Sequence, residues 1–456
     1  MKNEKMMKEA SVWKLLCTMS LPMILIMLVQ VVYHMADVFF MGRSGSYMQV
    51  AAISLASPVF SIISAFNTLI GFGGCTAVSM ALGKGDTQKV RQYSSFVFWS
   101  GILVGIIVGA AILLGMDPIL GLLGANEETA GFTADYLRIL AVGAPVSIAG
   151  GALANTLRAD GESKGAMIAM MLGTITNIVL DPILISTFGM GIRGAAVATV
   201  LGNLVSCVGM LIAMQKKEAF SASWKDLTLA KDVSLRILGY GVPMAAGTLL
   251  MSLSAMFSNR VLVSFGNDAV AAQGVAGKAG MLISMVIMGI CMGMQPAVGY
   301  NHGAGNTKRV HKLVFGTALF SMVLGTVMAA GVFLMRQGFV GAFLDDPAVT
   351  GIAVRMVTAS LLGAPFFGVY QMASVYLQGT GKVSYATVTS LLRQGIILMP
   401  VLLVLTRLFG LTGFMYSAVV ADLISTGISL VLCLRWAKEQ KEKAKAPEFR
   451  AMAAQA

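Results

Sequence analysis

Twelve apolar stretches, each long enough to cross a bilayer as a helix, run through this chain of 456 residues. A transmembrane helix needs about 20 mostly apolar residues. The stretches expected to span are 15–40, 51–81, 94–115, 132–156, 165–187, 194–214, 237–264, 271–299, 313–334, 352–378, 384–406 and 412–434. Because a helix satisfies its backbone hydrogen bonds internally, the pattern predicts an all-α integral membrane protein with twelve transmembrane helices.

The composition indicates that lipid, more than water, surrounds this chain. Hydrophobic residues make up 57% of it and charged residues 12%, about half the charged share usual in soluble domains. The net charge of +12 would by itself suit a nucleic-acid partner. The basic residues, however, lie in short clusters between apolar stretches, which is typical of membrane topology. We therefore expect a lipid bilayer and no nucleic acid as partner.

The basic clusters fall on one side of the predicted membrane. They occupy the N-terminus, the connections 84–91, 158–164, 216–236 and 308–312, Lys382 and the tail after 435. The alternate connections hold acids such as Asp117 and Glu127. By the positive-inside rule both termini are expected in the cytoplasm. The first stretch is too long for a signal peptide, so we expect it to be retained.

An internal repeat divides the chain into two halves. Residues 85–90 read G-D-T-Q-K-V and residues 305–310 read G-N-T-K-R-V, an offset of 220. The same offset, within one residue, relates further pairs, among them Ala144 and Ala364, Pro145 and Pro365, Pro22 and Pro243, and Gly194 and Gly413.

Each half holds six predicted spans. We expect an N-terminal lobe at 1–214, a cytoplasmic linker at 215–236, a C-terminal lobe at 237–434 and a cytoplasmic tail at 435–456. Because six is even, both lobes enter the membrane in the same orientation. They are then related by a pseudo-twofold axis along the membrane normal, with a cleft between them.

Acidic residues inside the membrane are the first candidates for function, because each costs several kcal/mol at that depth. Asp37 lies four residues after Tyr33 and Asp181 four residues after Asn177, so each pair shares a helix face. Both carboxylates are expected in the outer half of the bilayer, with the Thr199 hydroxyl at a similar depth.

This group predicts a cation-coupling pocket. A buried carboxylate pair suits proton exchange, and the same hard oxygens could hold a dehydrated Na⁺ instead. The alternative is that these polar groups only join helices together. His34, three residues before Asp37, could relay protons or could simply pack.

Asp422 and Arg393 form a second candidate. Each lies near mid-bilayer on one of two sequential spans, so a neutralising ion pair in the C-terminal lobe is the simpler expectation, and contact with substrate is the alternative. The chain also has 33 methionines, and flexible thioethers suit a promiscuous pocket for aromatic guests.

Motifs for metals, cofactors and enzymatic chemistry are missing from the sequence. It has no G-x-x-x-x-G-K-[ST], no G-x-S-x-G and no H-E-x-x-H, the five cysteines form no CxxC, and the three histidines do not cluster. We expect no enzyme, no cofactor and no metal site other than a Na⁺ at the coupling pocket. An ion gradient remains as the energy source.

Several motifs, in order and spacing, resemble those of the multidrug and toxic compound extrusion (MATE) family, and of its DinF-like bacterial branch most of all. They extend from about residue 14 to 436 and comprise Pro22, Ala36-Asp37 leading into Met41-Gly42-Arg43, the Gly85 and Gly305 loops, Leu157-Arg158 through Gly161, and Asn177-x-x-x-Asp181-Pro182.

The resemblance implies a monomeric two-lobed exporter of amphipathic organic cations in a bacterial cytoplasmic membrane. It would exchange them for H⁺ or Na⁺ by alternating access. In the DinF-like branch the coupling role would fall to Tyr33, Asp37, Asn177, Asp181 and Thr199, with Tyr136 as a supporting position. Spans 237–264 and 352–378 lack the acids that another branch uses for sodium.

Two rival functions remain at this point. A flippase for lipid-linked precursors or polysaccharides would share the two-lobed architecture, but it needs a more basic cleft, for which Arg393, Arg260 and Lys278 are the candidates. An intramembrane enzyme acting on prenyl substrates would need clustered acids for Mg²⁺.

Overall fold

The protein is described by a computed structural model that covers residues 2–31, 47–161, 163–344 and 346–445. The secondary structure of these residues is helical. The predicted site residues Tyr33, His34 and Asp37 lie outside the described residues.

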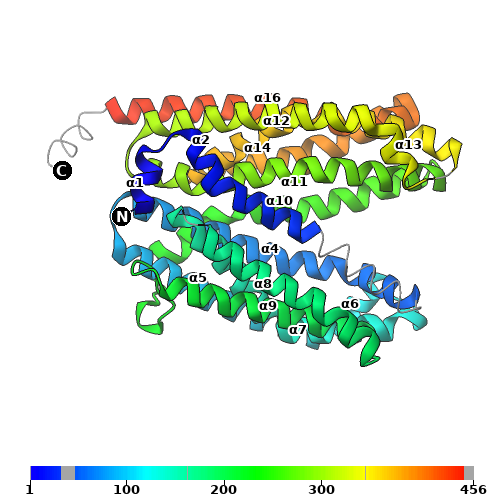
Figure 1. Ribbon diagram of the computed structural model, residues 1–456, viewed down its shortest axis with the longest axis horizontal. Helices are drawn as coiled ribbons and strands as arrows, with labels where there is room; N and C mark the ends of the chain where they lie inside the picture. Colours follow the sequence, from blue (N-terminus) through cyan, green and yellow to red (C-terminus); the bar gives the residue numbers. More distant parts are fainter. Residues whose placement is uncertain (1, 32–46, 162, 345, 446–456) are drawn as a thin grey trace.

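The helices form two bundles that follow the two halves of the sequence (Figure 1). The chain enters through α1 (Lys2–Glu9), α2 (Val12–Leu15) and η1 (Leu16–Ser20), the last two within a first span that runs from Val12 to Val31. The N-terminal lobe continues with α4 (Tyr47–Gly83), α5 (Thr87–Leu114), α6 (Met116–Leu123), α7 (Glu127–Thr156), η2 (Leu157–Asp160), α8 (Lys164–Pro182), η3 (Ile183–Thr187) and α9 (Ile192–Gln215). The C-terminal lobe holds α10 (Lys231–Val263), α11 (Asn267–Gly303), α12 (Thr307–Gly341), α13 (Pro347–Leu361), α14 (Ala364–Gly379), α15 (Val383–Leu391), η5 (Leu392–Ile397) and α16 (Leu398–Lys445).

The predicted set of membrane spans is confirmed, with two differences in detail. Among the described residues ten helices are long and apolar enough to cross a bilayer, and α13 with α14, bent by 43°, supplies one more. The bend divides the predicted span 352–378, because Pro365 in the first turn of α14 cannot continue the preceding helix. The predicted spans 384–406 and 412–434 are joined at Gly410, whose φ of 57° and ψ of −137° break the helix.

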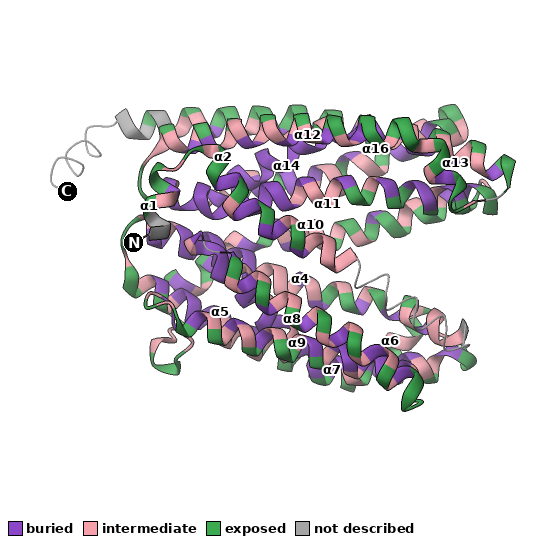
Figure 2. Ribbon diagram, in the orientation of Figure 1, coloured by how far each residue is buried: buried purple, intermediate pink, exposed green. Residues whose placement is uncertain are grey.

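Large apolar side chains cover the outer faces of both bundles. Figure 2 shows exposed residues along these faces and buried ones between the helices. Leu114 is 89% exposed, Leu334 81% and Val142 72%. Exposure of this kind on many helices is what lipid tails cover in a membrane protein.

The repeated loops 85–90 and 305–310 act as helix starts. Gly85 and Gly305 adopt φ of 74° and 72°, which favours glycine. The next residue caps the following helix in each half: the Asp86 carboxylate accepts from the Lys89 N–H at 3.0 Å, and the Asn306 side chain accepts from the Arg309 N–H at 3.1 Å. The repeat therefore conserves one local structure twice.

The two lobes pack backbone against backbone near these loops. We call the end of the molecule where α1 begins and α16 ends the terminal end (Figure 1). The end of α11 lies there too, since the Asn301 amide donates to the Met7 carbonyl of α1 at 3.0 Å. A Cβ at Gly83 would overlap the Tyr300 carbonyl oxygen, and one at Gly303 would overlap that of Met80. The helices approach this closely only because glycine has no side chain.

Two further symmetric contacts extend the lobe interface toward mid-membrane. On α10, Gly241 lies against the Leu69 carbonyl of α4. On α11, Gly293 lies against Ser20 of the first span, whose hydroxyl donates to the Ile290 carbonyl at 2.9 Å. Thus α10 of the C-terminal lobe packs on the N-terminal lobe, and the first span of the N-terminal lobe packs on the C-terminal lobe.

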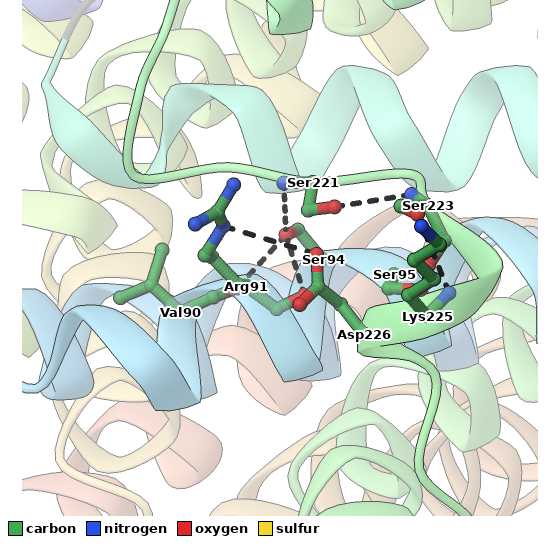
Figure 3. Close-up of polar contacts among 8 residues, drawn as sticks. All are labelled: Val90, Arg91, Ser94, Ser95, Ser221, Ser223, Lys225 and Asp226. Carbon is green, nitrogen blue, oxygen red and sulfur yellow. Dashed lines mark hydrogen bonds and ion pairs between the residues drawn. The ribbon is translucent and has the colours of Figure 1, made fainter.

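The connection between the lobes lies along α5 (Figure 3). The Ser95 hydroxyl donates to the Ser223 carbonyl at 2.7 Å, the Ser221 N–H donates to the Ser94 hydroxyl at 3.0 Å, and Arg91 lies 3.8 Å from Asp226. Residues 216–230 are therefore held on the N-terminal lobe, and α10 begins at Lys231, earlier than the predicted span.

Replacing Gly241 by alanine should destabilise the packing of the two lobes, because the new Cβ would overlap the Leu69 carbonyl. We expect a loss of about 2 kcal/mol, typical of overpacking, measured as a lower thermal unfolding midpoint in detergent. The control is Gly274→Ala on α11, where a Cβ meets no atom within 4 Å. Equal effects of the two variants would contradict the packing argument.

Candidate functional site

A cavity of about 460 Å³ lies inside the N-terminal lobe between α4, α7, α8 and α9. The first span and α10 each contribute one residue to its wall. The polar residues that line it are Gln30, Ser64, Asn67, Ser147, Thr174, Asn177, Thr199, Asn203 and Ser206, and the larger apolar ones are Phe60, Ile63, Met170, Met210 and Met251. The cavity is therefore lined both by neutral, oxygen-bearing side chains and by methionines and an aromatic ring.

Two of the predicted coupling residues meet at the cavity wall. Asn177 on α8 and Thr199 on α9 are both buried, and the Asn177 Nδ2 donates to the Thr199 Oγ1 at 3.5 Å. The helices come close because Gly202 faces Asn177, where an added Cβ would lie 3.0 Å from the Asn177 Cβ. The Asn177 Oδ1 has no hydrogen-bond partner in the described part of the chain. A buried amide oxygen of this kind is a suitable ligand for a hard cation.

Asp181 lies one turn further along α8 and is fully buried. It does not line the cavity but follows Asn177 on the same helix face. Pro182 comes next, and the chain continues as the π-helix η3. Proline removes one backbone donor, and π-helical turns are frequent at functional sites. Tyr136, the supporting position predicted on α7, is also buried.

Several cavity residues were not predicted from the sequence. The Asn203 amide donates to the Ser147 hydroxyl at 2.8 Å, joining α9 to α7. Asn67 on α4 lies against Gly151 of α7, where a Cβ would overlap its amide. The sequence feature that could have identified Asn203 and Ser206 is their spacing from Thr199. The three residues recur at intervals of four and three and so share one face of α9.

The C-terminal lobe has an ion pair at the matching place. The Arg393 Nε lies 2.5 Å from the Asp422 Oδ1, and the guanidinium Cζ lies 4.6 Å from the centroid of the Phe367 ring. At the offset of 219 that relates Gly194 to Gly413, Asp422 corresponds to Asn203 of the N-terminal cavity. The N-terminal lobe therefore has a neutral amide, Asn203, at the position where the C-terminal lobe has a carboxylate paired with Arg393.

Replacing Arg393 alone by leucine should cost about 3–5 kcal/mol of stability, because it leaves the Asp422 carboxylate buried without its cation. The double variant Arg393→Leu, Asp422→Leu removes both charges and should recover most of that loss. Thermal unfolding in detergent measures both. A double variant as unstable as the single one would show that the pair is not a neutralising unit.

Comparison with known proteins places these features in a family. The MatE family model matches residues 22–183 and again 243–404, so each lobe carries one copy. The multidrug export protein MepA of Staphylococcus saprophyticus is 31% identical over 427 residues, 93% of this chain and 94% of that protein. MepA of Staphylococcus aureus is 32% identical over 425 residues, 92% of this chain and 94% of that protein.

A solved structure shares the fold over nearly the whole chain. It is described as the outward-facing conformation of a multidrug resistance MATE family transporter of the MOP superfamily. It superposes with a TM-score of 0.90 at 22% identity and covers 97% of this chain and 99% of its own. The two copies of the family model and the relatives over nine-tenths of the length confirm the resemblance seen in the sequence: this multi-pass membrane protein belongs to the MatE family.

Proposed function

We propose that the protein is a secondary active multidrug exporter that moves amphipathic organic cations out of a bacterial cell in exchange for H⁺ or Na⁺. The observation that carries the proposal is the cavity of the N-terminal lobe, with the Asn177 amide and Thr199 hydroxyl in its wall and the buried Asp181 carboxylate one turn away. The names of the Staphylococcus relatives support the choice of drugs as cargo.

The packing of the lobes supports alternating access. The glycine contacts at Gly83 and Gly303 close the terminal end, and the Gln295 amide donates across the interface to the Thr76 hydroxyl at 3.1 Å. The basic clusters of the sequence lie at this end, so we assign it to the cytoplasm, with both termini inside. The conformation described is then the one that admits no substrate from the cytoplasm.

Ion coupling is assigned to the N-terminal lobe. Protonation of Asp181, or Na⁺ held by Asp181, Asn177 and Thr199, would change the charge and packing between α8 and α9. The sequence spacing adds Asp37, Tyr33 and His34 to this group. Gln30, in the same predicted span, lines the cavity, and Tyr33 and Asp37 follow at intervals of three and then four residues, as on one face of a helix. The energy for export then comes from the ion gradient, with no cofactor.

Methionines from both lobes suit an amphipathic, aromatic cargo. Met23 and Met292 are buried with Phe72 between the lobes, and Met27, Met167, Met170, Met244 and Met288 pack around them. Thioether side chains rearrange at low cost around ligands of different shape. A flippase for lipid-linked precursors is less well supported, because Arg393, one of the cations it would use, is held by Asp422.

Asp181→Asn should abolish gradient-driven transport while the protein still inserts. We expect the initial rate of dye accumulation in inverted vesicles to fall by at least about tenfold, because the amide cannot exchange a proton or neutralise Na⁺. Imposing a pH gradient and a sodium gradient separately identifies the coupling ion.

The matched control for this experiment is Asp135→Asn. Asp135 lies on α7, is half-buried and pairs with Arg193 at 2.8 Å and with Arg138 at 3.4 Å. We expect its rate to stay within about twofold of the unaltered protein. Unchanged transport in Asp181→Asn under both gradients would remove Asp181 from the coupling mechanism.

A further inference from the structure

Arg158 is a buried cation with no acidic partner among the residues that the structure describes. It lies in η2 at the terminal end of α7 and is 2% exposed. Its Nη2 donates to the Asn155 Oδ1 at 2.5 Å, its Nη1 lies 2.7 Å from the Met23 sulfur, and its Cζ lies 5.8 Å from the Phe72 ring centroid. No carboxylate in the described ranges of the chain forms an ion pair with it.

This arrangement is unusual because an arginine keeps its charge in proteins. Buried charges are normally paired, since an uncompensated one costs several kcal/mol. The acid nearest in sequence is Asp160, which lies 2.6 Å from the Lys217 ammonium. A neutral amide, a thioether and a ring face are weak partners compared with a carboxylate.

The repeat shows that the fold does not need a charge at this position. At the offset of 220, Arg158 corresponds to Gln378 and Asp160 to Thr380. Gln378 is equally buried, and its Nε2 donates to the Ser374 hydroxyl at 2.9 Å. The Thr380 hydroxyl accepts from the Trp436 indole N–H at 2.9 Å. The same turn of the C-terminal lobe is therefore built from neutral groups, and the charge of Arg158 calls for another explanation.

The guanidinium adjoins the methionine cluster of Met23, Phe72 and Met292 described above. Met23 belongs to this cluster and touches Arg158. Met170 packs against it and also lines the N-terminal cavity. Ala154 of α7, four residues before Arg158, lines the same cavity. A chain of packed side chains therefore leads from the cavity through the methionines to the buried cation.

We propose that Arg158 is an anion subsite on the substrate path, which binds the carboxylate of zwitterionic aromatic compounds while the methionines hold their rings. The proposal rests on the export function proposed above. Met23 comes from the first span and Met292 from α11, so separating the lobes at the terminal end uncovers the guanidinium. A carboxylate then replaces the thioether as acceptor and gains a charge-assisted, bidentate hydrogen bond.

The test uses one dye in two forms: a rhodamine with a free carboxylate, which is zwitterionic, and its ethyl ester, which is a cation. Dissociation constants are measured by fluorescence anisotropy on the purified full-length protein in detergent, and export is measured in inverted vesicles. In Arg158→Gln, we expect affinity for the acid to fall by about tenfold or more, with affinity for the ester unchanged within about twofold. Glutamine should fold here, since Gln378 occupies the equivalent place.

Two further variants complete the test. Arg158→Lys keeps the charge without the planar fork, so its affinity for the acid should be intermediate. Arg309→Gln removes a half-buried cation at the same end of the other lobe and should leave the acid-to-ester ratio unchanged.

Parallel losses for acid and ester in Arg158→Gln would assign the arginine a purely structural role, and no change for either would also overturn the subsite. If the unaltered protein binds both dyes but exports neither, the export function fails while the acid-to-ester ratio still decides the subsite.

Discussion

The close approach of the two lobes, backbone against backbone, is the contact on which the rest of the structure depends. Gly83 and Gly303 bring α4 and α11 together at the terminal end, and Gly241 brings α10 against α4. Lipid tails supply no hydrophobic force between helices, so small residues and close packing must hold such an interface. The same contacts close the lobe interface at the terminal end, and Met23, Phe72 and Met292 are buried between the lobes.

The two lobes share a fold and differ in the chemistry they bury. In the N-terminal lobe, Asn203 and Asn177 line a cavity next to Asp181. In the C-terminal lobe, the position equivalent to Asn203 is Asp422, already paired with Arg393. Near the terminal end the N-terminal lobe instead carries the charge: its buried Arg158 corresponds in the repeat to the neutral, buried Gln378 of the C-terminal lobe. Repetition supplies the scaffold twice, and the few charged substitutions between the copies give the two lobes different buried polar groups.

Much of the fold and part of the site could be predicted from the sequence. The spans follow from apolar length, and the two lobes follow from the repeat of the Gly85 and Gly305 loops, whose cap geometry the structure shows. Asn177 and Thr199 were expected to share a pocket, and they meet at 3.5 Å. Asn67 and Ser147 were not expected there, because their place in the cavity depends on which faces of α4 and α7 turn inward, and an almost wholly apolar helix gives little periodicity from which to read this.

The sequence by itself determined the solvent, the number of spans, the division into halves and the expected side of the basic loops, because each follows from local composition and length. Only the tertiary structure decided which polar groups meet. Asn155 and Met23 are the neighbours of Arg158, and Asp160 instead binds Lys217, 57 residues away. Such pairings depend on how helices distant in the chain are rotated against one another. That rotation is set by the packing of the whole bundle, including its close glycine contacts, and cannot be inferred from any single segment.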